Sequence, residues 1–259
     1  MCGRLNIQVT QLTKLLIAIL QEEYPGGDNP NAAPTETLPV LRARDDGQIE
    51  CVPMRWWLTP SWSQGPSSRY SMFNAKAETA GQSPAFRGPF AKQRCVVPVS
   101  GFYEWQRRAG QKQPFLISDQ AQEGLLLAGL WDAWQPRGSA GGAAELLSFT
   151  LLTTPAHPSL DDLHHRQPVF LRPEQAVQWL DPQVETSALK PLLASDLPVP
   201  LQLTPVSSEV NNARNKNPRC YHPVGSAQLV SADVAFAADS LHTIQPQELF
   251  EQENIIVDT

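Results

Sequence analysis

The sequence predicts an α+β fold in which one strongly bent, barrel-like sheet of mixed or antiparallel strands is flanked by a few helices. Short runs rich in β-branched and aromatic residues dominate the middle of the chain, as is typical of strands. Pro39, Pro53 and Pro98 interrupt several of these runs. Because proline cannot donate to a β-ladder, it favours strand ends, edges and bulges over the central strands of a parallel sheet. With 259 residues, 41% of them hydrophobic, the chain is long enough for a single domain with one large core.

The expected elements follow in chain order. Residues 8–22 carry apolar side chains at helical spacing, with Thr10 as the expected N-cap. Residues 25–34, rich in Pro, Gly and Asn, are expected to form a loop. Pro173 stands where a second helix, through Trp179, would begin, and 187–194 is expected to form another short helix. The strand-like runs are 38–42, 49–57, 94–105, 114–118, 125–134, 146–154 and 168–171.

Two segments are expected to lie outside regular structure. The Gly/Ala/Ser stretch 137–144 is typical of a flexible hairpin loop. Beyond about residue 226 the apolar pattern weakens, so we expect a domain over 1–225 and a mobile acidic tail over 226–259. The sequence has no run of about eighteen apolar residues and no secretory signal pattern. A cytoplasmic protein that does not contact the membrane is therefore expected.

Charge and cysteine content narrow the chemistry. The net charge of −6 argues against wholesale electrostatic binding to nucleic acid. Residues 1–116, however, hold 13 Lys and Arg against 9 Asp and Glu, which fits either a local basic surface or chance combined with an acidic tail. The four cysteines contain no C-x-x-C pair, so reduced thiols are expected. Cys220 and His222 are spaced like metal ligands, but no second close pair accompanies them, and we expect no metal site.

The chain opens with M-C-G-R. Methionine is normally removed before a small residue, which would make Cys2 the first residue. A free α-amine has a pKa of about 7.7–8.0, well below that of lysine, and is a ready nucleophile toward an aldehyde. The thiol of the same residue can then add to the imine carbon and close a thiazolidine. An internal cysteine cannot do this, because its nitrogen is part of an amide.

Two other interpretations of Cys2 stay open at this point. Amidotransferases of the N-terminal nucleophile class also begin M-C-G and use the thiol as acyl acceptor. Such enzymes need an oxyanion hole and a clamp for glutamine, whereas an aldehyde trap needs an acid and a polar cradle for the Schiff base. Cys2 is otherwise an incidental residue near a terminus.

Seven ordered motifs carry a resemblance to a known family. They are M-C-G-R at 1–4, N-A-A-P-T-E-T-L-P-V from 31, M-R-W-W-L-T-P-S-W from 54, N-A-K-A-E-T at 74–79, R-C-V-V-P-V-S-G-F-Y-E-W at 94–105, L-H-H-R-Q-P-V at 163–169 and V-S-S-E-V-N-N from 206. The chain resembles the SRAP (SOS response-associated peptidase) family of abasic-site processing proteins, which crosslink themselves to abasic DNA. The resemblance extends to about residue 225 and implies one SRAP-like domain.

The resemblance implies a catalytic set of Cys2, Asn74, Glu104 and His164. Cys2 would form the covalent bond, and Asn74 would hold the terminal residue and substrate oxygens through its amide donors and acceptor. Glu104 lies among aromatic residues in G-F-Y-E-W, so burial is expected to raise its pKa and let it open the closed sugar as a general acid. His164 would stabilise or protonate the Schiff base. On an extended strand only one of His164 and His165 could face the site.

A further set of residues is expected to contact DNA. Arg4, Lys76 and Arg166 suit phosphate contacts, and Trp62 and Trp105 suit stacking on unpaired bases. The chain departs from the family pattern at three positions, with Trp57 in place of a glycine, Lys76 in place of an arginine and His165 in place of a small acidic or polar residue. The full expected DNA-binding set is Gly3, Arg4, Trp62, Lys76, Trp105 and Arg166.

The resemblance implies a function in DNA repair. After loss of Met1, a monomer would bind an abasic site in single-stranded DNA, associated with the nucleoid, and join Cys2 to the sugar as a thiazolidine. Schiff-base lyase activity and autocatalytic removal of Met1 are also implied, and no cofactor is required. The alternatives are a glutamine amidotransferase-like hydrolase, which would release ammonia, and a DNA-binding module that forms no covalent bond.

Overall fold

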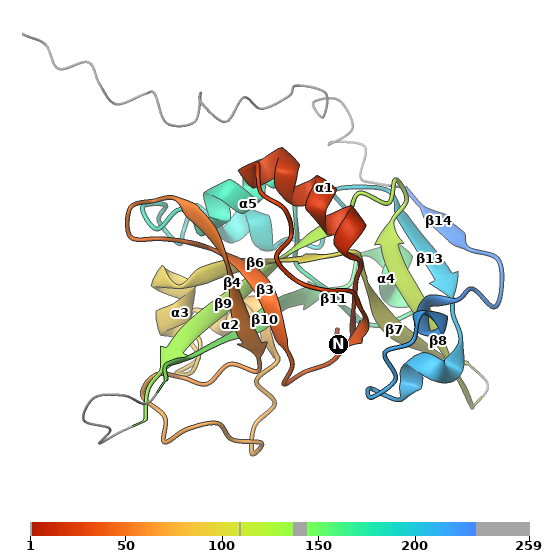
Figure 1. Ribbon diagram of the computed structural model, residues 1–259, viewed down its shortest axis with the longest axis horizontal. Helices are drawn as coiled ribbons and strands as arrows, with labels where there is room; N and C mark the ends of the chain where they lie inside the picture. Colours follow the sequence, from red (N-terminus) through yellow and green to blue (C-terminus); the bar gives the residue numbers. More distant parts are fainter. Residues whose placement is uncertain (1, 109, 137–143, 232–259) are drawn as a thin grey trace, which may run out of the picture.

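Two β-sheets meet side by side in the computed structural model, which describes residues 2–108, 110–136 and 144–231. In Figure 1 the sheet that contains β3, β4, β6, β9 and β10 lies to the left, and the sheet that contains β7, β8, β13 and β14 lies to the right. Helix α1 lies across the top of the molecule. The arrangement confirms the expected α+β class.

Five strands close into a barrel. They are β3 (Thr37–Ala43), β4 (Ile49–Trp56), β6 (Arg94–Val99), β9 (Leu125–Trp134) and β10 (Leu146–Pro155). The ladder runs β10-β4-β3-β6-β9, and β9 pairs again with β10, which closes the ring. Only the β10–β4 pairing in this ring is parallel, so the barrel is mixed, as expected. Pro39 and Pro53 face each other in the β3–β4 ladder, beyond the part of β3 that pairs with β6.

The second sheet is antiparallel throughout and has the order β14-β13-β8-β7-β1-β2. Its central strands, β7 (Gly101–Arg108) and β8 (Gln111–Asp119), continue directly from barrel strand β6. Gly101 makes this continuation possible, because a Cβ there would lie 2.6 Å from the carbonyl oxygen of Ile117. The remaining strands are β1 (Leu5–Ile7), β2 (Asn29–Ala32), β13 (Leu201–Pro205) and β14 (Gln228–Val230).

Helix α1 spans Val9–Leu20 and therefore does not begin after Thr10. Its N-cap position is Gln8, whose side chain makes no capping bond. The carboxylate of Asp28 performs this role from the following loop, accepting a 2.7 Å hydrogen bond from the Val9 amide. The expected N-cap was wrong because a residue distant in sequence satisfies the helix end. The helix expected at Pro173 is α5 (Pro173–Leu180), and 187–194 contains the short 3₁₀ helix η1 (Lys190–Leu193).

Two expected irregular segments contain strands. Residues 29–32, placed by the sequence in a loop, form β2 and pair with β1. Gln228–Val230, within the expected tail, pair with β13 as β14. Residues 232–259 of that tail and 137–143 of the expected hairpin loop lie outside the described residues. The strands on either side of the latter, β9 and β10, pair as a hairpin in which Trp134 faces Leu146.

Short elements complete the fold. They are β5 (Asn74–Lys76), α2 (Ala77–Ala80), α3 (Arg87–Lys92), α4 (Pro158–Asp161), β11 (Arg166–Pro168), β12 (Phe170–Leu171), η2 (Ser208–Asn211) and η3 (Pro218–Tyr221). The buried rings of Trp56 and Phe149, on the paired strands β4 and β10, stack at a centroid distance of 6.2 Å. Within the described parts of the chain, no helix has the length and hydropathy needed to cross a bilayer.

Candidate functional site

The four expected catalytic residues lie on the two sheets, two on each. Cys2 lies just before β1 and Glu104 lies in β7, and these two strands pair in the antiparallel sheet. Asn74 opens β5, which pairs with barrel strand β10, and His164 stands just before β11, which pairs with the same strand. The site is thus assembled where the antiparallel sheet meets the barrel.

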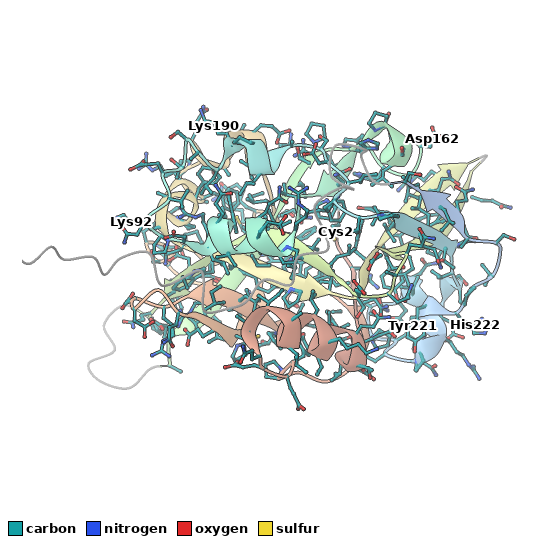
Figure 2. All side chains as sticks on the ribbon, turned by 90° about the horizontal axis from the view of Figure 1, so that it is seen from above. Cys2, Lys92, Asp162, Lys190, Tyr221 and His222 are labelled. Carbon is teal, nitrogen blue, oxygen red and sulfur yellow. The ribbon has the colours of Figure 1, made fainter. Side chains whose placement is uncertain are left out.

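The backbone of the amino-terminal segment fixes the position of Cys2. The carbonyl oxygen of Arg4 accepts a 2.9 Å hydrogen bond from the Tyr103 amide, and Leu5 pairs with Phe102. The carbonyl oxygen of Cys2 itself accepts a 2.8 Å bond from Nδ2 of Asn74, across the junction of the two sheets. Cys2 is only 1% exposed, and it lies near the middle of the view in Figure 2, whereas Lys92 and Asp162 lie nearer the edges.

Asn74 is held by its strand. It pairs with Leu151 of β10 in a short parallel ladder, beyond the point where β4 pairs with the same strand. The segment 57–73 leaves the barrel between these two pairings and returns to place Asn74 beside Cys2. The other amide atom, Oδ1, is buried and has no hydrogen-bond partner among the described residues. Asn74 therefore binds Cys2 through its donor and keeps an acceptor for a further N–H or O–H group.

Glu104 is 5% exposed and lies opposite Phe115 in the β7–β8 ladder. Burial raises the pKa of its carboxyl group, as the aromatic surroundings in the sequence predict. Burial also raises the pKa of the Cys2 thiol well above its usual range, and the nearby Glu104 raises it further. Glu104 and His164 line the same cavity, whose volume of about 10 Å³ matches a single water molecule.

His164 is half-buried, and burial lowers its pKa. Its Nδ1 lies 3.0 Å from the Arg166 amide nitrogen and 3.1 Å from the Arg166 carbonyl oxygen. His164 and His165 do not lie on an extended strand, because β11 begins only at Arg166. The strand alternation used to separate the two histidines therefore does not apply here, although His164 alone of the two lines the cavity with Glu104. Their rings stack at a centroid distance of 4.3 Å, and His165 is exposed.

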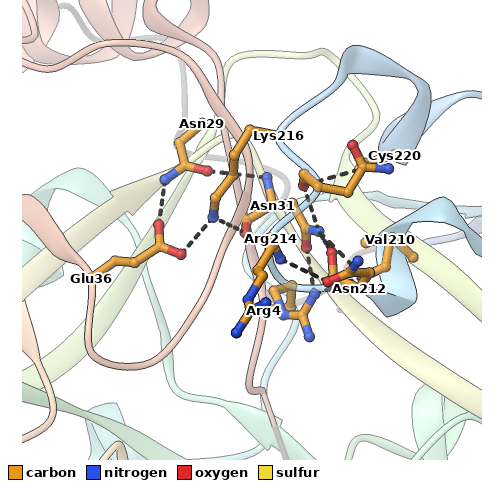
Figure 3. A network of polar contacts seen from close by, with 10 residues as sticks. Arg4, Asn29, Asn31, Glu36, Val210, Asn212, Arg214, Lys216 and Cys220 are labelled. Carbon is orange, nitrogen blue, oxygen red and sulfur yellow. Dashed lines mark hydrogen bonds and ion pairs between the residues drawn. The ribbon is translucent and has the colours of Figure 1, made fainter.

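The Arg4 guanidinium forms hydrogen bonds to other parts of the protein. Its Nη1 donates to Oδ1 of Asn31 at 2.7 Å and to the carbonyl oxygen of Val210 at 2.6 Å (Figure 3). The Asn31 amide in turn donates to the carbonyl oxygens of Val210, Asn212 and Asn215. This network, which we call the Arg4–Asn31 clasp, ties the amino-terminal segment to the chain around η2. Burial lowers the pKa of Arg4.

The other expected phosphate ligands differ in exposure. Arg166 is 9% exposed, and its guanidinium forms a two-bond ion pair with the Glu78 carboxylate. Lys76 is exposed, at the end of β5. Gly3 is partly exposed between Cys2 and Arg4. Of the three cationic candidates, Lys76 presents its charge most directly to solvent.

The two residues expected to stack on bases, Trp62 and Trp105, also differ in exposure and in their protein contacts. Trp62 is 59% exposed on the segment 57–73. Trp105 donates from its indole N–H to Oδ1 of Asn211 at 2.6 Å. The Arg4 guanidinium lies 5.6 Å from the centroid of the Trp105 ring, and the Lys112 amine lies 4.9 Å from it. Trp105 therefore contacts several protein groups, and Trp62 is the more exposed of the two rings.

Trp57, which departs from the family pattern, shapes the same segment. Its ring packs against Phe73 at a centroid distance of 5.6 Å, and its indole N–H donates to the Ser67 carbonyl oxygen at 3.0 Å. The segment is also anchored to the barrel, where Asp132 accepts a hydrogen bond from the Ser61 amide. These contacts hold the exposed Trp62 on an ordered support.

Asn31, Glu78 and Thr153 hold the segments around the site, and the sequence alone predicts no role for them. Asn31 and Glu78 stand in motifs that the sequence singled out, N-A-A-P-T and N-A-K-A-E-T. The motifs marked these residues as noteworthy, but the residues that they or their neighbours bind lie far away in the sequence. Arg166 lies 88 residues from Glu78, and Val210 lies 206 residues from Arg4.

Among the described residues, no three or more His, Cys, Asp or Glu side chains are grouped so that they could hold a metal ion. Cys220 is buried in a small apolar cluster with Tyr103, Val206 and Val210. His222 is exposed, at the edge of the molecule in Figure 2. The two side chains occupy different environments.

Known proteins share this fold and sequence pattern. A solved structure from Bacteroides thetaiotaomicron superposes with a TM-score of 0.65 over 78% of this chain and 88% of its own, at 23% identity. A phage-related protein from Bordetella bronchiseptica gives a TM-score of 0.62 over 80% of this chain and 95% of its own, at 27% identity. The first likeness concerns the fold alone.

Two curated relatives are named abasic site processing proteins. The abasic site processing protein YoqW of Bacillus subtilis is 31% identical over 229 residues, which are 84% of this chain and 97% of YoqW. The abasic site processing protein HMCES of Gallus gallus is 33% identical over 226 residues, covering 75% of this chain and 66% of HMCES. The family model for SOS response associated peptidase matches residues 1–213. This match covers most of the chain, so the chain belongs to the SOS response associated peptidase (SRAP) family.

Proposed function

We propose that this protein processes abasic sites in single-stranded DNA by forming a thiazolidine crosslink through Cys2. One observation carries the proposal. The Cys2 carbonyl is bound by the Asn74 amide at 2.8 Å, with the buried carboxyl of Glu104 close enough to raise the pKa of the Cys2 thiol. The names of the curated relatives support abasic-site processing as the general activity.

The environment of the thiol supports an order for the covalent steps. A thiol whose pKa is strongly raised stays protonated near neutral pH, so the amine is the better first nucleophile. After hydrolysis removes Met1, the Cys2 amine attacks C1′ of the open sugar, and loss of one water gives the Schiff base. The Cys2 sulfur then adds to the same carbon, and its proton passes to the imine nitrogen. The product is a thiazolidine, and the only other product is water.

Glu104 suits the opening of the sugar. Its raised pKa favours a protonated carboxyl, which can donate to O4′ as the C1′–O4′ bond of the hemiacetal breaks. His164, across the small cavity, has a lowered pKa and is neutral near pH 7, so it can accept the hydroxyl proton that is released at C1′. The pair divides the acid and base roles because burial favours the neutral form of each group, a protonated carboxyl and an unprotonated imidazole.

Lyase chemistry branches from the same Schiff base. When the thiol does not add, a base can remove a proton from C2′, and the electron pair expels the 3′ phosphate by β-elimination. Hydrolysis of the Schiff base then releases the protein and the cleaved strand. The proposal therefore includes lyase activity, together with removal of Met1 by the protein itself.

The proposed DNA contacts follow the exposure of the candidate residues. Lys76 would contact a phosphate and Trp62 would stack on an unpaired base, since both side chains are exposed close to Asn74 in the chain. Gly3 lets the strand approach the terminal segment. Arg4, Trp105 and Arg166 support the site from within. We propose a monomer that acts in the cytoplasm and joins the nucleoid when it binds damaged DNA.

Denaturing electrophoresis with a single-stranded abasic oligonucleotide tests the proposal. Protein whose Met1 has been removed, as verified by mass spectrometry, should give a slower band that survives denaturation, and Cys2→Ala should give none. An oligonucleotide without the lesion should leave both proteins unshifted. Absence of the band from the wild-type protein would refute the crosslink, and ammonia release from glutamine would instead favour the amidotransferase alternative.

A further inference from the structure

The Arg166 guanidinium is buried, and a carboxylate lies against it. Its Nη2 lies 2.9 Å from Oε2 of Glu78, and its Nη1 contacts the other oxygen of the same carboxylate. Nη2 also donates to the carbonyl oxygen of Thr153 and, at 3.2 Å, to its hydroxyl. A buried arginine without its carboxylate is costly, so Glu78 determines where this side chain can rest.

This ion pair connects the two segments that carry Asn74 and His164. Glu78 lies in α2, which directly follows β5, and Asn74 is the first residue of β5. Arg166 is the first residue of β11, two positions after His164. Thr153 lies between them on β10, and its hydroxyl donates to the Ala75 carbonyl oxygen at 3.4 Å. The network therefore spans β5, β10 and β11.

The Arg166 backbone contacts the reactive ring. Its amide N–H donates to Nδ1 of His164, which places the proton of the neutral ring on Nε2. When the ring is protonated, the Arg166 carbonyl oxygen, 3.1 Å from Nδ1, can accept a hydrogen bond from the Nδ1–H group. One residue thus serves both protonation states, and its position determines which nitrogen is available to substrate.

We propose that Glu78 is a positioning residue that acts through Arg166 to fix the ring orientation and tautomer of His164. This inference rests on the proposed function for its catalytic consequence, but the ring itself can be observed without DNA. Besides burial, the charged groups that lower the pKa of His164 are the chain's amino terminus and, on its own segment, His165 and Arg166. Glu104 faces it across the small cavity.

Glu78→Gln removes the negative charge while keeping a side chain of similar shape. The positive charge of Arg166 is then uncompensated close to His164, so protonation of the ring becomes less favourable. We expect the titration midpoint of His164 to fall by several tenths of a pH unit and the Nε2–H tautomer to become less dominant. The acid limb of the crosslinking pH profile should move in the same direction, and Glu78→Asp should restore part of each effect.

Nitrogen-15 NMR of histidine-labelled protein measures both properties, with His164→Gln identifying the signal. Glu174→Gln is the matched control, because the exposed Glu174 in the first turn of α5 forms a separate ion pair with Arg172 at the helix N-cap. A folded Glu78→Gln protein with the wild-type midpoint and tautomer would overturn the inference, as would an equal shift in the control. If the wild-type protein forms no crosslink, the proposed function fails, yet the NMR comparison still decides the role of Glu78.

Discussion

The side-chain amide of Asn74 donates a 2.8 Å hydrogen bond to the backbone carbonyl oxygen of Cys2. The bond joins a residue of the barrel-side sheet to the segment that leads into the antiparallel sheet. It fixes Cys2 through its main chain, so the Cys2 sulfur and nitrogen do not take part in this contact. This geometry fits the proposed reaction, in which the amine and the thiol of Cys2 both take part.

Asn74→Ala tests this bond. The substitution leaves a buried carbonyl without its donor, which should lower the free energy of unfolding by about 1–3 kcal/mol. It should also slow crosslinking by about tenfold or more, because the Cys2 amine is then less often aligned with the sugar. Thermal unfolding and single-turnover gel assays measure the two effects. Crosslinking at the wild-type rate in a folded variant would show that Asn74 does not position Cys2.

Glu104→Gln tests the raised pKa of the buried carboxyl. A raised folded-state pKa means that the folded protein binds more protons than the unfolded chain above the ordinary glutamate pKa of about 4.3. The wild-type protein therefore loses stability as pH rises from that value through the folded-state pKa, and Glu104→Gln should not. Calorimetry near pH 4 and pH 8 should show the variant gaining relative to wild type at the higher pH.

The same variant should crosslink slowly at every pH, since an amide cannot donate a titratable proton to O4′. Glu50→Gln is a suitable control, because Glu50 lies on β4 in an ion pair with Arg42. An unchanged relative stability from about pH 4 to 8 would contradict a raised pKa for Glu104.

Trp62→Ala and Trp105→Ala should separate a DNA contact from a support. Loss of the exposed Trp62 should weaken binding to single-stranded DNA by about 1–3 kcal/mol, with little change in stability. Loss of Trp105 removes the partner of Asn211 and the ring beside Arg4, so it should destabilise the fold by about 2 kcal/mol. Fluorescence anisotropy and thermal melts make the comparison. Equal effects of the two variants on binding and on stability would contradict these assignments.

Lys76→Ala should reduce the salt dependence of DNA binding. Each phosphate neutralised on a single strand contributes about 0.7 to the slope of log affinity against log salt concentration, so the variant should lose about that amount. Lys14→Ala, on the exposed face of α1, is the control and should leave the slope unchanged. If both variants give the wild-type slope, Lys76 makes no phosphate contact.

The sequence predicted the barrel well because long runs of β-branched and aromatic residues predict strands wherever they pair. The run 94–105 spans two strands, since the chain passes from the barrel to the second sheet at Ser100. Strands β1, β2 and β5 have only three or four residues, and their conformation depends on pairing with distant segments. A local pattern cannot indicate such strands.

In the candidate site, too, the sequence predicts some features and not others. The motifs pointed to Cys2, Asn74, Glu104 and His164 as a candidate set, and the structure gives the burial and the raised pKa expected for Glu104. The sequence could not indicate that Arg4 and Arg166 have protein partners, because Val210 and Glu78 are far from them in the chain. Exposure of an arginine depends on tertiary contacts, which its own motif does not encode.

Intact mass spectrometry of the covalent product tests the central claim most directly. Protein that begins at Cys2, mixed with a single-stranded abasic oligonucleotide, should give a species whose mass is the sum of both molecules less one water. Borohydride should leave that mass unchanged, since a thiazolidine has no imine to reduce. Cys2→Ser should crosslink only when borohydride is present. A wild-type adduct that needs reduction to persist, or one formed equally by protein that retains Met1, would contradict the account.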